Sequence, residues 1–399
     1  MNKINKILFI LFLLIPFCGI TQVDIKFFID NQHDSVFYFT QYHGARNIVL
    51  DTLHLQNGMM RYKNKTKLPE GIYLLKTMEN IPALEVLVGK KQRFSVTINN
   101  LDDLNSAKVK GVKESANYYK LMAKVRQTEL NIRALENEKE HFSDNLRKID
   151  SLRQDLDNFE ESLKIRRKSA FINLVINSIK RHGIDDYWDG FALDDARILT
   201  YPLIDNKLDT YFDNLYADAD KINAEIDKLI AKTGDCIEVR DYLIWFFYRK
   251  YYSPKYMNLD DVYIHIVDEY FLKLEMSSVS ESVVNLMADR ANYLENLKIG
   301  AKLPEIGDLY DIDAEYITVI FYDKTCQKCA QEGRILEETR QKHPEMVIFP
   351  VEINSGIKEN IMSEYDIQTT PTIYVLDRKK HIIAKRIKAG QVEQILNMD

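Results

Sequence analysis

The chain has 399 residues, with 46% hydrophobic and 29% charged residues and a formal net charge of -6. This length predicts two or three domains rather than a single core, and the composition excludes a disordered polymer. No basic block dominates the sequence. Because nucleic-acid binding needs such a concentration of positive charge, the sequence argues against a nucleic-acid partner.

The first 21 residues have the layout of a secretory signal peptide. Two lysines precede an unbroken apolar run, 7–15, and small or polar residues follow it. Such a run is short for a permanent membrane-spanning helix, so we expect residues 1–21 to be removed on export. A lipoprotein signal, which also ends in a cysteine, leaves lipidation of Cys18 as the alternative. Bulky Phe17 stands where such signals carry a small residue.

Residues 22–112 are predicted to form a β-rich domain. Short apolar runs are separated there by turn residues such as Gly, Asn, Asp and Pro. In one run Phe94, Val96 and Ile98 alternate with polar residues, as one buried face of a sheet requires. We expect an antiparallel β-sandwich-like domain.

Residues 113–295 are predicted to form an α-helical domain. Neither Pro nor Gly occurs between Val112 and His182, and apolar residues recur there at steps of three and four. This pattern predicts a long amphipathic helix or a helical hairpin, with a phase slip near Leu152. Aromatic segments further along predict more buried helices. The long helix also offers a surface for a homodimer.

Residues 296–399 alternate between strand and helix patterns. The predicted strands are 316–322, 346–353, 372–376 and 381–387, and the predicted helices are 326–342, 357–365 and 391–397. Strand, helix, strand, helix, β-hairpin and a final helix describe a mixed sheet covered by helices. The whole chain is therefore expected to be a multidomain α+β protein.

Two cysteines, Cys326 and Cys329, lie at the junction of the first of these strands with its helix. A thiolate is the form that attacks disulfides, and the free N-H groups and dipole of a helix N-terminus stabilise it. A depressed pKa of Cys326 is therefore expected. Structural zinc is the competing interpretation, but it needs two more ligands, and His343 has no second Cys or His near it. The pattern favours redox chemistry, and no metal is expected.

Four segments of this region carry a resemblance to a known family. They are IGAKLPEIGDLYD (299–311), FYDKTCQKCAQE (321–332), YDIQTTPTIYVLD (365–377) and KAGQVEQIL (388–396). Together they resemble the thioredoxin superfamily, and most closely its TlpA/ResA-like exported thiol-disulfide oxidoreductases. The resemblance implies a C-terminal thioredoxin-like α/β domain. It also implies that no cofactor is needed beyond a redox-active disulfide between Cys326 and Cys329.

The resemblance also assigns roles to single residues. It implies that Cys326 and Cys329 are catalytic and that Pro371 follows a cis peptide bond. The backbone of Thr370 would then bind a substrate strand, and Glu332 would move a proton to or from Cys329. A solvated glutamate is the alternative for Glu332. The sequence departs from the family at Ile320, where thioredoxin has a buried acid, and at Gly333-Arg334, where a helix-kinking proline is expected.

The predicted function is that of an exported thiol-disulfide oxidoreductase, in the direction of disulfide reduction, in the periplasm or cell envelope of a Gram-negative bacterium. Its expected partners are proteins with disulfides or thiols and a membrane-bound thiol electron donor. Two alternatives stay open. One is a disulfide isomerase or oxidase, and the other is a redox-silent binding or scaffold protein of the cell envelope.

Overall fold

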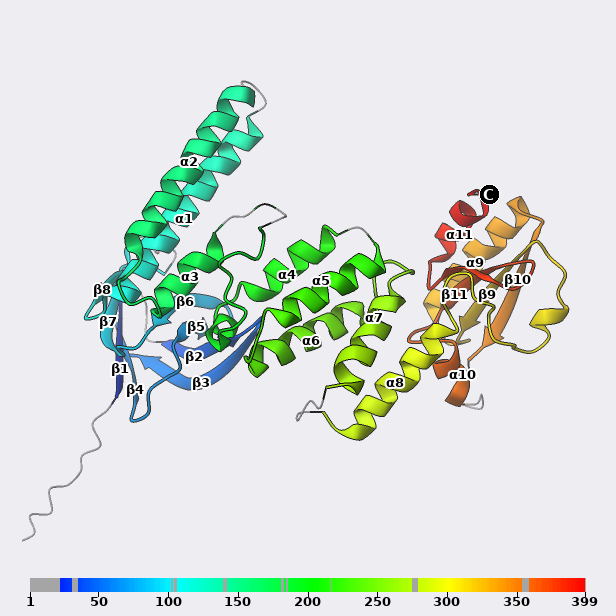
Figure 1. The fold of residues 1–399 in the computed structure, drawn as a ribbon, viewed down its shortest axis with the longest axis horizontal. Coiled ribbons are helices and arrows are strands. Elements are labelled where there is room, and N and C mark those ends of the chain that lie inside the picture. The colour runs from blue at the N-terminus through cyan, green and yellow to red at the C-terminus, as the bar shows by residue number, and fades with distance from the viewer. Residues whose placement is uncertain are drawn as a thin grey trace, which may run out of the picture. The chain divides into compact units, whose positions relative to one another are not determined.

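The computed structural model describes residues 22–30, 35–101, 103, 106–138, 142–180, 183, 186–215, 217–274, 279–353 and 359–398 (Figure 1). The predicted signal segment 1–21, with Cys18, lies outside these residues. The chain divides into two compact units, Met1–Lys207 and Leu208–Asp399. The division into domains at residues 112 and 295 stays a prediction.

The first unit contains two four-stranded sheets. One has the strand order β4-β1-β7-β8 and the other β3-β2-β5-β6. The strands are β1 (Val23–Ile29), β2 (Ser35–His43), β3 (Arg46–Leu55), β4 (Met59–Asn64), β5 (Gly71–Thr77), β6 (Pro82–Val88), β7 (Arg93–Ile98) and β8 (Lys108–Lys110).

The two sheets enclose one apolar core, as alternation in the strands predicts. Along β1 the residues Val23, Ile25 and Phe27 are fully buried and alternate with half-buried polar neighbours. They pack in one cluster with side chains from both sheets. The pairing is antiparallel, as expected, except between β1 and β7, which are parallel. The long chain segment between these two strands makes such a crossover possible.

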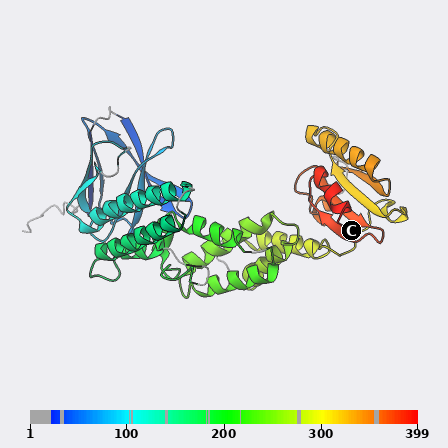
Figure 2. The same ribbon diagram turned by 90° about the horizontal axis from the view of Figure 1, so that it is seen from above.

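A helical hairpin follows the strands. Helices α1 (Lys113–Asn137) and α2 (Phe142–Leu163) run side by side in Figures 1 and 2. This settles the choice between one long helix and a hairpin. No break occurs at Leu152, where the apolar pattern changes phase, because α2 continues through it. Helix α3 (Phe171–Ile179) and the 3-10 turn η2 (Ala196–Thr200) complete the unit.

The second unit begins with helices whose aromatic residues are largely buried. Helix α4 (Ile204–Asp213) runs across the boundary of the units, and α5 (Ala219–Ala231), α6 (Ile237–Tyr252), α7 (Asp260–Ile266) and α8 (Glu281–Glu295) follow. A π-helical segment, η3 (Val267–Leu272), continues α7. Within the described ranges, no helix is both long and apolar enough to span a bilayer.

A four-stranded mixed sheet forms the rest of the second unit, with the order β10-β9-β11-β12. Its elements are β9 (Tyr316–Tyr322), α9 (Gln327–Lys342), β10 (Met346–Glu352), α10 (Glu359–Glu364), β11 (Thr372–Asp377), β12 (Ile382–Lys385) and α11 (Ala389–Leu396). Strand β9 is parallel to β10 and antiparallel to β11, which pairs antiparallel with β12. The predicted order of strands and helices is confirmed.

The central strand β9 has buried side chains on both faces of this sheet. Ile317, Val319 and Phe321 pack on one face, against a cluster that includes α10 and the segment before β9. Tyr316 and Ile320 pack on the opposite face, against residues of α9 and α11. Burial on both faces explains why the strand is an unbroken apolar run with only Thr318 as a polar residue. The strand therefore fixes the position where α9 begins.

Candidate active site

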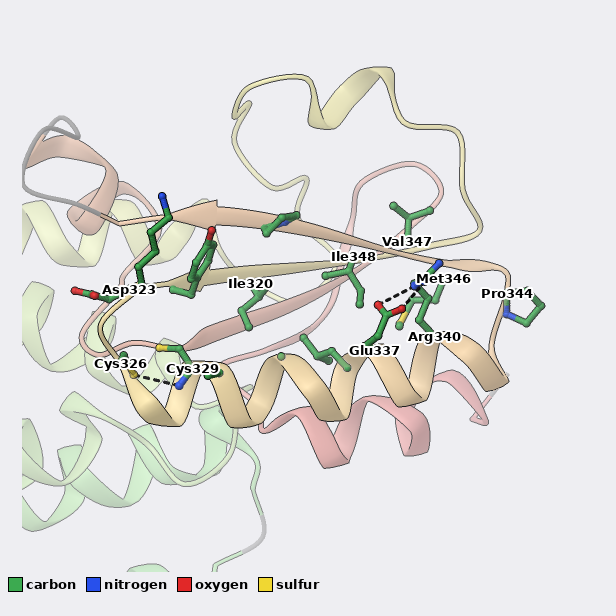
Figure 3. Close-up of a pocket in the computed structure, with 16 residues that line it drawn as sticks. Ile320, Asp323, Cys326, Cys329, Glu337, Arg340, Pro344, Met346, Val347 and Ile348 are labelled. Atoms are coloured by element: carbon green, nitrogen blue, oxygen red, sulfur yellow. Dashed lines mark hydrogen bonds and ion pairs between the residues drawn. The ribbon is translucent and has the colours of Figure 1, made fainter.

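Cys326 is the residue that caps the N-terminus of α9. Its Sγ accepts a hydrogen bond of 3.1 Å from the backbone N-H of Cys329. Figure 3 shows the two side chains together at the start of this helix. Both are free thiols, Cys326 partly exposed and Cys329 buried. The pair therefore has one sulfur that meets solvent and one that is held beneath it.

This environment separates the pKa values of the two thiols. Hydrogen bonds from Cys329, chiefly, lower the pKa of Cys326 below its ordinary value, against the opposing effect of burial. Burial, with the neighbouring sulfur of Cys326, raises the pKa of Cys329. The thiolate therefore forms on Cys326, which is the division of roles that attack by the exposed sulfur requires.

The turn before Cys326 is fixed by Asp323. Its carboxylate accepts hydrogen bonds from the N-H and the hydroxyl of Thr325, at 2.6 and 2.7 Å, which lower its pKa. Its backbone carbonyl accepts from the N-H of Cys326. Lys324, the next residue along the chain, forms an ion pair with Glu352 at 2.5 Å. The negative charge of Glu352 offsets the positive charge of Lys324, so Lys324 stabilises the Cys326 thiolate little. The helix N-terminus is therefore the main source of electrostatic stabilisation for this thiolate.

The loop before β11 lies opposite the cysteine pair. The Thr370-Pro371 peptide bond is cis, and the carbonyl oxygen of Thr370 lies 3.7 Å from Sγ of Cys326. Thr372 ties the loop to itself by donating a hydrogen bond to the carbonyl of Thr369. The structure thus brings together Cys326, Cys329 and the Thr370-Pro371 backbone.

A buried charged cluster anchors the same loop. Asp366 is 1% exposed and accepts hydrogen bonds from Arg290 of α8 (2.8 Å) and from Arg386 (2.6 Å). Gln368 also donates to Asp366, and it accepts from the hydroxyl of Tyr252 at the end of α6. Sequence reasoning missed this cluster. Asp366 lies within a recognised motif, but no spacing or pattern connects it to a helix 76 residues earlier.

The carboxylate of Glu332 contacts the N-terminus of α11. Its carboxylate accepts a 2.6 Å hydrogen bond from the backbone N-H of Ala389, the first residue of α11. Such a carboxylate satisfies a free donor at a helix N-terminus. The geometry therefore gives Glu332 a structural contact between two helices, and the proton-transfer role assigned to it stays a prediction.

Cys236 is the third cysteine of the described residues. It precedes the first residue of α6 and is partly exposed. Its Sγ lies 3.9 Å from a carboxylate oxygen of Glu238. Position at a helix start, rather than within the aromatic face, explains the exposure.

In the described part of the chain, no group of His, Cys, Asp and Glu side chains converges as a metal site.

The strand order β10-β9-β11-β12, with one helix after each of β9, β10 and β12, identifies the fold. Residues from Tyr316 to Leu396 have a thioredoxin-like fold. Its cysteine pair lies at the first helix, opposite a cis-proline, where the resemblance places both.

Comparison with known proteins gives matches only among solved structures. No family profile matches the sequence, and no curated protein is detectably similar to it. A thioredoxin-like protein from Bacteroides caccae aligns over 59% of this chain and 97% of its own, with 16% identity and a TM-score of 0.45. A domain of a possible thiol-disulfide isomerase from Cytophaga hutchinsonii aligns over 22% of this chain and 78% of its own, with 26% identity and a TM-score of 0.20.

A third match is the thioredoxin domain of a thiol-disulfide oxidoreductase from Bacteroides vulgatus. It covers 25% of this chain and 96% of that one, with 20% identity and a TM-score of 0.23. These neighbours are thioredoxin-like proteins, mostly from Bacteroides. At these TM-scores the fold assignment depends on the strand order and connections described above.

Proposed function

We propose that this protein is an exported thiol-disulfide oxidoreductase that reduces disulfides of other proteins. The observation that carries the proposal is the position of the Cys326 thiol. It lies at a helix N-terminus with a lowered pKa, above a buried partner thiol and within 3.7 Å of the cis-proline loop. A nucleophile with a resolving partner and an adjacent backbone strand is the arrangement that disulfide exchange needs.

The exchange takes place in two steps. The Cys326 thiolate attacks one sulfur of a substrate disulfide, which forms a mixed disulfide and releases the other substrate sulfur as a thiolate. Cys329, after losing its proton, then attacks Sγ of Cys326 and releases the second substrate thiol. The substrate gains two electrons and two protons, and the pair becomes a disulfide. A membrane-bound thiol donor would return the pair to the dithiol form.

Backbone groups of the loop orient the substrate in this proposal. The carbonyl of Thr370 accepts a weak hydrogen bond from the Cys326 thiol. Ionisation of that thiol frees the carbonyl to accept from an N-H of an extended substrate segment, which adds as a short strand. Such pairing holds the substrate sulfur in line with Sγ without selecting any particular side chain.

Reduction of insulin disulfides in the presence of dithiothreitol tests the proposal. The wild-type chain should accelerate insulin precipitation, and Cys326→Ser should abolish the effect. Cys236→Ser is the matched control, because this partly exposed thiol has no role in the proposal and its loss should change nothing. A rate equal to that of dithiothreitol alone would favour the redox-silent scaffold instead.

Export is tested separately, by mass spectrometry of the mature N-terminus from a Gram-negative host. A first residue near Gln22 supports signal removal, whereas a lipidated Cys18 supports membrane anchoring. Retention of the intact segment 1–21 in the cytoplasm contradicts both.

A further inference from the structure

A groove of about 700 Å³ begins at the cysteine pair and follows α9 (Figure 3). One face of α9 forms one wall, and strands β9 and β10 form the other. The lining residues from α9 recur at helical spacing: Cys329, Ala330, Gly333, Leu336, Glu337 and Arg340. The groove is therefore continuous with the two sulfur atoms that exchange disulfides.

Apolar side chains form most of the groove lining, and its charged groups lie toward the two ends. The apolar residues are Ile320, Leu336 and Met346, each less than 5% exposed, and half-buried Ile348. Asp323 lies at the cysteine end, and the ion pair of Glu337 with Arg340 lies toward the other end (Figure 3). Ile320, at the position of thioredoxin's buried acid, thus belongs to an apolar surface that reaches the pair.

Gly333 is one of the α9 residues that line the groove. Glycine inside a helix destabilises it relative to alanine, so its presence there calls for a reason. A positive φ is not the reason, because Gly333 is not among the residues that adopt one. Crowding is not the reason either, since a Cβ placed on Gly333 would meet no atom within 4 Å. The space above Gly333 is the groove itself, and any larger side chain would enter it.

The sheet leaves the groove accessible along its length. At the opposite edge, the segment before β9 covers β12, with hydrogen bonds between Gly300 and Ile382 and between Leu303 and Lys380. At the groove side β10 is the last strand of its sheet, and no strand of the described residues extends it. An extended chain can therefore reach the groove from the side as well as from the cysteine end.

The dimensions fit a short peptide segment. From Cys329 to Arg340 the helix advances eleven residues, or about 16 Å at 1.5 Å per residue, which an extended chain covers with about five residues. We propose that the groove binds an extended, apolar segment of about five residues that adjoins the reacting cysteine of a substrate protein. This inference rests on the proposed exchange of protein disulfides, and it names the class of proteins that the pair selects.

The test uses two peptides, each joined through its cysteine to nitrothiobenzoate, whose release by the full-length protein is followed by absorbance. One peptide carries Val and Leu around the cysteine, and the other carries Ser and Gly. Burial of even one such side chain should lower the KM for the apolar peptide by about tenfold or more relative to the polar one. Gly333→Leu should fill the groove and bring the ratio of the two KM values to about one. Hydroxyethyl disulfide, which is too small to fill the groove, serves as the reference substrate.

Folding does not obscure this comparison, because leucine is a better helix former than glycine and position 333 has free space. Gln331→Leu is the matched control, since it adds the same side chain to an exposed position of α9 outside the groove lining. Equal KM values for both peptides with the wild type would overturn the proposal, as would equal loss with every substrate in Gly333→Leu. Failure of the wild type to act even on hydroxyethyl disulfide would instead refute the redox function on which the proposal rests.

Discussion

Replacement of Asp366 by Asn should lower the free energy of unfolding of the thioredoxin-like region, although the substitution exchanges only one oxygen atom for an amide nitrogen. Asp366 is 1% exposed, and the guanidinium groups of Arg290 and Arg386 both donate to its carboxylate. A neutral amide would leave the half-buried guanidinium group of Arg290 without its carboxylate partner, while Arg386 would keep only Asp260. Removal of one partner from a buried pair costs about 3–5 kcal/mol.

Hydrogen exchange of peptides from β11 and β12 measures this loss at pH 7. A cost of 3 kcal/mol corresponds to exchange that is faster by roughly a hundredfold. The matched control is Asp313→Asn, because Asp313 pairs with Arg378 but both side chains are more than two-thirds exposed. That variant should change exchange less than about threefold, as for other exposed ion pairs. Equal exchange in Asp366→Asn and wild type would refute the reasoning.

The same pair predicts the pH dependence of stability. Burial tends to raise the pKa of Asp366, but the hydrogen bond and charge of Arg290, with the charge of Arg386, outweigh it and hold the pKa below the ordinary value. A carboxyl with a depressed folded-state pKa stabilises the fold above its unfolded pKa of about 3.9, and this contribution is lost as the pH falls through the folded value. The melting-temperature difference between wild type and Asp366→Asn should therefore be constant from pH 8 to 5 and shrink below pH 4. A difference that widens in acid would contradict this.

Three further predictions concern single positions. Alkylation of Cys326 by iodoacetamide should follow a midpoint below the ordinary thiol pKa of about 8.5, because the pKa of this thiol is lowered; a midpoint at or above that value contradicts the site geometry. Gly71→Ala should destabilise the first unit by about 1–3 kcal/mol in urea unfolding, because the new Cβ would lie 2.6 Å from Oγ1 of Thr200; an unchanged midpoint would show that Thr200 moves freely. Glu332→Ala should lower the free energy of unfolding by about 1 kcal/mol, because the N-H of Ala389 loses its acceptor. Glu332→Gln should retain most of the stability, because its amide oxygen can still accept. Slower resolution of the mixed disulfide in the stable Gln variant would support the proton-transfer role.

Local pattern was sufficient for the elements that carry the cysteine pair. An apolar run buried on both faces identifies β9, and the polar helix after it places Cys326 at a helix start. The prediction of a cis bond before Pro371 depends on the family resemblance, because most X-Pro bonds in folded proteins are trans. These features depend on neighbouring residues or on a motif, and both can be seen in the sequence.

Features that depend on distant residues were not visible. The parallel pairing of β1 with β7 joins residues almost 70 positions apart, and nothing in either strand distinguishes it from an antiparallel neighbour. Arg290 is an ordinary helix residue until the fold places it beside Asp366. Gly333 did give a signal, because it replaces an expected proline, but its meaning depends on an empty space that only tertiary packing creates.

Pro350 lies in β10, the outermost strand of the sheet next to the cysteines. A proline has no N-H, so a further strand laid against this edge would lose a hydrogen bond at that point and meet the pyrrolidine ring. Two copies of the domain are thereby hindered from joining their sheets edge to edge, which is a common route to fibrous aggregates. The β10 edge of the sheet can therefore accept a substrate segment for a short time, while Pro350 opposes stable association between two copies of the sheet.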